Sequence, residues 1–204
     1  LATYRAHLVI ADPEWAYAEG LSRLRRHGWL LGRAALRAAA TEAGVDPGPM
    51  IGSSARGAPM VDGALVSISH KAEAAVALLC ARAPAGAGEL TGVGVDLESA
   101  QGPRTDISAR VCTAAELARL APSSAVRRRQ LAVIFAVKEA IYKAIDPTLG
   151  RYVGFREVEL SPGLWADGVG SASWHGPERL ALQLSVSWQG HGEFVLATAA
   201  ARPA

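Results

Sequence analysis

The sequence lacks several features that would mark a membrane, secreted or nucleic-acid-binding protein. No apolar run among its 204 residues reaches the roughly 18 residues that a membrane span needs, because Arg, Glu or Pro interrupts each candidate. The formal net charge is only +2, which is too small to indicate general nucleic-acid binding. Half of the residues are hydrophobic and one fifth are charged, as in folded globular proteins, so the chain can form one large domain or two small ones.

Cysteine is also scarce. Cys80 and Cys112 form no spaced metal motif, so we expect two reduced thiols with ordinary packing roles. The chain begins at Leu1 without a basic and then apolar leader, so secretion is not indicated. We therefore expect a cytoplasmic protein that does not bind membranes.

Hydrophobic periodicity and turn residues predict alternating helices and strands. We expect a long helix over 15–43 and a loop over 48–63. A hairpin turn over 71–73 should join the first two strands, and a small-residue loop over 84–89 should precede the third. The capping box Thr113–Glu116 should open a short helix, and a longer helix should run over 127–145 and end at Pro147. Strands are expected over 64–70, 74–81, 92–98, 153–160, 180–188 and 194–200.

A short internal echo indicates two related halves. Ser67-Ile68-Ser69-His70 and Ser185-Val186-Ser187-Trp188 are each followed at the same offset by an apolar segment. The polar residues 99–110 are the best junction. We therefore predict an α+β fold with two pseudosymmetric halves, 1–100 and 101–204. Each half should be an antiparallel sheet packed with helices, with an active-site cleft between the halves.

Residues 94–98, Gly-Val-Asp-Leu-Glu, combine a strand pattern with two acids. Side chains alternate along a strand, so Asp96 and Glu98 project together while Val95 and Leu97 face the core. Gly94, on the acidic face, should leave room for a ligand near the backbone. Taken alone, the pattern also fits a half-buried strand whose outer face happens to be acidic.

A second group of charged residues lies in the predicted helix over 127–145. Glu139 and Lys143 stand four residues apart, a spacing that also suits a surface ion pair worth a few tenths of a kcal/mol. Lys138 could be one more solvated lysine. Together with Asp96 and Glu98, however, these residues suit a divalent cation that holds a phosphorylated substrate. Carboxylate oxygens bind a hard metal, and ammonium groups neutralise phosphate.

Four sequence blocks in order resemble the phosphopantetheinyl transferases, specifically the larger single-chain class of surfactin-type and enterobactin-type enzymes. The blocks are Arg56-Gly-Ala-Pro59, Ser67-Ile-Ser-His70, Gly94-Val-Asp-Leu-Glu98 and Phe135-Ala-Val-Lys-Glu-Ala-Ile-Tyr-Lys143.

This resemblance implies a role for each matching residue. Asp96, Glu98 and Glu139 should coordinate Mg²⁺, which bridges the pyrophosphate of coenzyme A, and Lys138 and Lys143 should contact the phosphates. Ser69 and His70 should approach the pyrophosphate or the ribose phosphate. The basic positions Arg25, Arg33 and Arg56 should hold the ribose phosphate and flank the adenine, although Arg23 and Arg26 compete with Arg25 for its place in the match.

The resemblance also implies the reaction. A serine hydroxyl of an apo acyl, aryl or peptidyl carrier protein attacks the β-phosphate of coenzyme A, with Glu139 as the base and Lys143 at the leaving group. The catalytic set is therefore Glu139, Lys143 and Asp96. Carriers of fatty-acid, polyketide and peptide synthases are usually acidic near this serine, and the basic cluster 127–129 could steer them. The analogy favours a monomer. A Mg²⁺-dependent phosphodiesterase acting on coenzyme A or a nucleotide, or a non-catalytic relative that binds coenzyme A or a carrier, would use similar residues.

Overall fold

The computed structural model describes residues 8–71, 74–82, 89–164 and 168–204. The chain divides into two compact units, residues 1–85 and 86–204. Residues 72 and 73 of the predicted hairpin turn, and residues 84–88 of the predicted loop, lie outside the described residues. None of the helices within the described ranges is long and apolar enough to cross a membrane.

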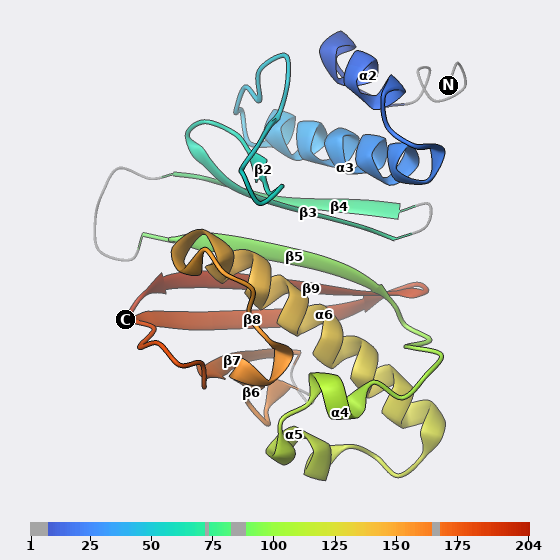
Figure 1. The fold of residues 1–204 in the computed structure, drawn as a ribbon, viewed down its shortest axis with the longest axis vertical. Coiled ribbons are helices and arrows are strands. Elements are labelled where there is room, and N and C mark those ends of the chain that lie inside the picture. Colours follow the sequence, from blue (N-terminus) through green and yellow to red (C-terminus); the bar gives the residue numbers. More distant parts are fainter. Residues whose placement is uncertain (1–7, 72–73, 83–88, 165–167) are drawn as a thin grey trace. The chain divides into compact units, whose positions relative to one another are not determined.

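The first unit packs a long helix, α3, on an antiparallel pair of strands (Figure 1). Its core is formed by Leu36 of the helix together with Ile51, Val61 and Ala64. The short strands β1 and β2 form a second antiparallel pair. The elements are α2 (Asp12–Glu19), α3 (Arg23–Glu42), β1 (Gly52–Ser53), β2 (Pro59–Met60), β3 (Ala64–Lys71) and β4 (Ala74–Ala81).

The single helix predicted over 15–43 is broken in the structure. Helix α2 ends at the cap residue Gly20, and α3 begins after Ser22. The guanidinium group of Arg26 donates hydrogen bonds to the carbonyl oxygens of Ala18, Glu19 and Leu21 at 2.8 to 3.0 Å. A helix leaves its last carbonyl groups without partners, so an arginine one turn into the next helix stabilises the break.

The second unit packs a longer helix, α6, on one face of a five-stranded antiparallel sheet (Figure 1). The strand order is β5-β9-β8-β7-β6. Apolar side chains of α6 such as Ile134 and Ile141 form the core with Val186 and Val195 of the sheet. The elements are β5 (Gly92–Ser99), α4 (Ser108–Val111), α5 (Ala114–Arg119), α6 (Ser124–Leu149), the 3₁₀ turn η1 (Phe155–Glu157), β6 (Val158–Leu160), β7 (Val169–Trp174), β8 (Leu182–His191) and β9 (Phe194–Pro203).

The predicted fold class is confirmed, because each unit is an antiparallel sheet packed with helices. The predicted boundary after residue 100 needs correction, because β5 belongs to the second unit. Strand β5 pairs with β9 along its whole length, from Gly92 opposite Ala201 to Ser99 opposite Phe194. Backbone pairing and packing under α6 thus outweigh the polar composition of residues 99–110, which suggested the junction.

Several element boundaries also differ from the predictions. Helix α6 continues through Pro147 to Leu149, because a proline in the last turn removes a single helical hydrogen bond, and it ends at Gly150 with a φ of 61°. Residues 155–157, predicted as strand, form η1, and β7 was not predicted. The two segments of the internal echo are not paired in the same way in the structure. Ser67 pairs with Leu78, so an equivalent pairing would place Ser185 opposite Leu196. Ser185 instead pairs with Ala200, four residues further along.

Candidate active site

Strand β5 and helix α6 approach closely because both present small residues. A Cβ atom on Gly92 would lie 1.9 Å from the carbonyl oxygen of Ala144, and one on Gly94 would lie 1.8 Å from that of Ala140. Only glycine therefore fits at these two positions. The expectation that Gly94 leaves room for a ligand is wrong, because the backbone of α6 fills that space.

This contact places the acidic residues of β5 beside α6. Strand side chains alternate, so Asp96 and Glu98 share the face of Gly92 and Gly94 that packs on the helix. Asp96 is 6% exposed. The ammonium group of Lys143 donates hydrogen bonds to Asp96 Oδ1 and to the carbonyl oxygen of Val95, both at 2.8 Å. The predicted proximity of Asp96 and Lys143 is therefore present in the structure.

Glu139 lies in the same electrostatic environment. Burial raises the pKa of its carboxyl group, and the negative charges of Asp96 and Glu98 raise it further, whereas Lys143 lowers it. The three carboxylates thus influence one another. In the described parts of the chain, no three His, Cys, Asp or Glu side chains are already grouped closely enough to hold a metal ion.

Lys138 does not join this group. Its side chain is almost completely buried, and its ammonium group donates to Glu116 Oε2 at 2.7 Å and to the carbonyl oxygens of Val111 and Phe155 at 2.9 Å. Burial lowers the pKa of Lys138, and Glu116 opposes this effect. An ammonium group has three hydrogens, and these three acceptors use all of them. In this structure Lys138 is therefore not placed to contact a phosphate, contrary to the expectation from sequence.

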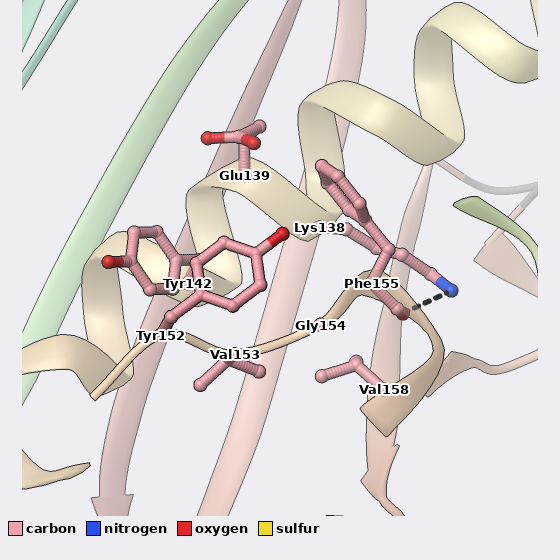
Figure 2. Close-up of a pocket in the computed structure, with 8 residues that line it drawn as sticks. All are labelled: Lys138, Glu139, Tyr142, Tyr152, Val153, Gly154, Phe155 and Val158. Atoms are coloured by element: carbon pink, nitrogen blue, oxygen red, sulfur yellow. Dashed lines mark hydrogen bonds between the residues drawn. The ribbon is translucent and has the colours of Figure 1, made fainter. Parts of the chain in front are cut away.

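Next to Glu139, a small pocket of about 50 Å³ opens on α6. Figure 2 shows its lining, in which the rings of Tyr142 and Tyr152 lie on one side and Phe155 on the other. The ring centres of Phe155 and Phe135 are 5.2 Å apart. In the same view the carboxylate of Glu139 and the ammonium group of Lys138 leave α6 on different sides. The acid and the buried lysine, although adjacent in sequence, therefore face different surroundings.

Comparison with known families agrees with this geometry. A model of the 4'-phosphopantetheinyl transferase superfamily matches residues 92–199, which is more than half of the chain and includes β5 and α6. The chain belongs to this superfamily. A second model, of the 4'-phosphopantetheinyl transferase N-terminal domain, matches residues 16–80. The family predicted from the four sequence blocks is thereby confirmed, and with it a transferase of phosphopantetheine.

Two solved structures with some similarity are shorter than this phosphopantetheinyl transferase. An ACPS–CoA complex from Chronobacterium ammoniagenes is 23% identical with a TM-score of 0.42, and it covers 55% of this chain and 96% of its own. The acyl carrier protein synthase of Mycobacterium tuberculosis is 22% identical with a TM-score of 0.35, and it covers 56% and 99% respectively. A search among curated proteins found no match.

The N-terminal domain of the transferase carries the remaining predicted residues, and Arg33 is the most buried of its basic ones. Its Nη2 atom donates to Ser53 Oγ at 3.2 Å, and its guanidinium carbon lies 4.7 Å from the centre of the Trp29 ring. Glu14 Oε1 is 3.9 Å from its Nε atom. Burial lowers the pKa of Arg33, and the charge of Glu14 acts in the opposite direction. A coenzyme A contact by Arg33 remains a prediction.

The other predicted residues of this domain differ in exposure. His70 and Arg56 are exposed, whereas Ser69 is buried. A Cβ atom on Gly28 of α3 would lie 2.3 Å from Cε1 of His70, so the imidazole rests where α3 has no side chain. Arg25 is exposed, and the competing residue Arg26 is held by the end of α2. This favours Arg25 over Arg26, and the phosphate contacts of all four predicted residues stay predictions.

Sequence reasoning missed residues that hold predicted site residues or their neighbours in place within each unit. Gly28 and Gly32 stand four residues apart on α3, and a Cβ on Gly32 would lie 2.8 Å from Ile68. A glycine pair at helical spacing is a readable signal of close approach by another element. The partner of Lys138, Glu116, was recognised only as part of a capping box, which the structure confirms.

Proposed function

We propose that this chain is a Mg²⁺-dependent phosphopantetheinyl transferase of the larger single-chain class, which modifies a serine of an apo carrier protein. The observation that carries the proposal is the crossing of β5 and α6. There Asp96 and Lys143 are hydrogen-bonded and the charges of Asp96 and Glu98 act on Glu139. The occurrence of both family matches in one chain supports the single-chain class. A monomer is part of the same proposal.

The donor set at this crossing suits Mg²⁺. Asp96, Glu98 and Glu139 supply hard oxygen ligands. Their mutual repulsion, which adds to the effect of burial in raising the pKa of Glu139, favours a cation beside them. Bound there, Mg²⁺ would polarise the pyrophosphate of coenzyme A. Lys143, already held at Asp96, would neutralise charge that develops on the leaving phosphate.

The proposed step transfers one phosphopantetheinyl group. The carrier serine oxygen forms a bond to the β-phosphorus of coenzyme A, the bond from that phosphorus to the bridging oxygen breaks, and adenosine bisphosphate leaves. Glu139 accepts the proton of the serine hydroxyl. Burial suits Glu139 to this role, since a raised pKa makes a carboxylate a better base near neutral pH.

Acidic carriers would be attracted by exposed arginines near the start of α6. Arg128 and Arg129 are exposed. Arg127 is instead drawn toward the preceding segment, with its Nη2 atom 3.0 Å from Ser108 Oγ and its Nε atom 3.4 Å from Asp106 Oδ2. We therefore assign the steering of carriers to Arg128 and Arg129, and this modifies the expectation from sequence for Arg127.

The test is mass spectrometry of an apo carrier protein incubated with this chain, coenzyme A and Mg²⁺. We expect a phosphopantetheine adduct with the unmodified chain, none with Asp96→Ala, and a large loss of turnover with Glu139→Gln. Glu193→Gln, an exposed acid in the turn between β8 and β9, is the matched control and should retain activity. Coenzyme A that is hydrolysed without any carrier would indicate the phosphodiesterase instead. Near-normal turnover by Glu139→Gln would remove Glu139 as the base.

A further inference from the structure

The buried pair Lys138 and Glu116 joins five elements of the second unit, namely α4, α5, α6, η1 and β6. Besides the contacts of Lys138 to the end of α4 and to η1, Glu116 Oε2 accepts a hydrogen bond from the backbone nitrogen of Thr113 at 2.8 Å. Its Oε1 atom accepts one from the backbone nitrogen of Leu160, in β6, at 2.9 Å. Glu116 is 1% exposed and Lys138 is 2% exposed. Both charges are thus fully enclosed and hydrogen-bonded on every side, as a stable buried pair requires.

The first unit contains the same arrangement. Glu14 of the short helix α2 is completely buried, and it accepts hydrogen bonds from Arg37 Nε at 2.6 Å and from the backbone nitrogen of Ile51 at 3.1 Å. Arg37 also donates to the carbonyl oxygen of Gly48. Arg37 and Lys138 each lie fourteen residues after the first residue of their long helix.

This repetition indicates that the buried pair has a role in the fold and not in phosphate binding. In each unit a glutamate of a short helix binds a cation of the following long helix and a backbone N–H group further along the chain. In the first unit the residue after the cation is Ala38, whereas in the second it is Glu139. The buried pair of a glutamate and a cation is therefore a component of the fold in both units. The second unit alone has an acid, Glu139, directly after the cation.

We propose that Lys138 is a positioning residue, which fixes the rotation of α6 so that Glu139 faces the carboxylates of β5. Successive residues of a helix point about 100° apart, so a lysine locked toward α4, α5 and η1 sets the direction of its neighbour. Lys138 makes no contact with coenzyme A in this proposal. The role assigned to Glu139 is that of the proposed function, on which this inference rests.

A double-mutant cycle tests the lock by itself. Urea unfolding is measured for Lys138→Met, Glu116→Gln and the double variant. We expect each single variant to be strongly destabilised and the double variant to be clearly more stable than the sum of the two losses, since each single change leaves a buried group without its partner. Additive losses, or wild-type stability of Lys138→Met, would overturn the proposal.

Positioning is tested by binding, with Mn²⁺ as a paramagnetic probe of the metal site and coenzyme A measured at saturating Mn²⁺. In Lys138→Met, or in the double variant if the single one does not fold, we expect Mn²⁺ affinity to fall about tenfold and coenzyme A affinity to change less than twofold. Unchanged Mn²⁺ affinity would reduce Lys138 to a structural role. A selective loss of coenzyme A affinity would instead show a phosphate contact, and either result overturns the proposal.

The two proposals fail in different ways. In one outcome the wild-type chain binds Mn²⁺, and Lys138→Met lowers the Mn²⁺ affinity as expected, but the wild-type chain modifies no carrier. Only the transfer reaction is then refuted. If the wild-type chain binds no Mn²⁺, the metal site and the positioning role of Lys138 are both refuted, whatever the result of the unfolding cycle.

Discussion

Replacing Gly94 with alanine should force strand β5 away from helix α6. The new methyl group would lie 1.8 Å from the carbonyl oxygen of Ala140, 2.8 Å from its carbonyl carbon and 3.0 Å from the backbone nitrogen of Ala144. All three neighbours are backbone atoms, so no side chain can rotate away. The strand or the helix must shift by about 1 Å or more before the contact becomes tolerable, since overpacking of a rigid interior is relieved only by backbone movement.

The expected loss of stability follows from this geometry. Adding one carbon to a well-packed core costs roughly 1–3 kcal/mol, and two opposed backbones place Gly94 at the upper end, about 3 kcal/mol. The change from glycine to alanine within a strand returns about 0.5–1 kcal/mol through the unfolded chain. The net loss is therefore about 2 kcal/mol, which corresponds to a fall in Tm on the order of 10 °C for a unit of this size.

Urea unfolding followed by circular dichroism measures this loss, and Gly190→Ala is the matched control. Gly190 also lies in a strand of the same sheet, but the nearest atom to its Cβ is the flexible end of Arg129 at 3.9 Å. Its substitution should change the free energy of unfolding by less than about 0.5 kcal/mol. Equal stability of the two variants would refute the close contact of β5 and α6. Carrier modification should fall with Gly94→Ala alone, because a displaced β5 carries Asp96 away from the helix.

Three further predictions concern charged and reactive groups. Hydrogen bonds from Arg151 lower the pKa of Glu178 to about 2, below its unfolded value of about 4.3. The ion pair of Arg151 and Glu178 therefore stabilises the fold above about pH 4.3, and this stabilisation is lost as the pH falls toward 2. An NMR titration of the Arg151 guanidinium group measures this, and a signal that shifts above pH 5 would contradict the prediction. Burial raises the pKa of Cys112 to about 11. Iodoacetamide at pH 8 should therefore alkylate the partly exposed Cys80 before Cys112. Alkylation of Cys112 first would be incompatible with the fold. Arg128→Glu should raise the KM for an acidic carrier several-fold and leave that for coenzyme A unchanged; an unaltered carrier KM would exclude Arg128 from docking.

The sequence predicts the parts of the fold that depend on local pattern. Strand alternation places Asp96 and Glu98 on one face, and the spacing of Thr113 and Glu116 predicts a capping box that the structure contains. Charged residues four apart on a helix likewise place Glu139 and Lys143 on the same side. These inferences succeed because each depends on the geometry of one element.

The inferences that fail depend on contacts between distant elements. Nothing near Lys138 in the sequence shows that its ammonium group meets Glu116 and two carbonyl groups, so a lysine beside a predicted ligand was assigned to phosphate. The role of Gly94 could not be read from β5 alone, because the atom that excludes a side chain belongs to Ala140. The predicted boundary after residue 100 was misplaced for the same reason, because β5 pairs with β9, which lies about one hundred residues later in the chain.

The hydrogen bond between Lys143 and Asp96 has a consequence for how the protein would bind the proposed metal ion. An ammonium group at this carboxylate acts as an internal counter-ion, so part of the negative charge at the crossing is balanced while the chain folds. A divalent ion would then arrive by exchange with a tethered cation, and folding would not have to wait for it. On this basis chelation should silence the transferase while leaving its melting temperature nearly unchanged, in contrast to proteins whose structure is assembled around a metal.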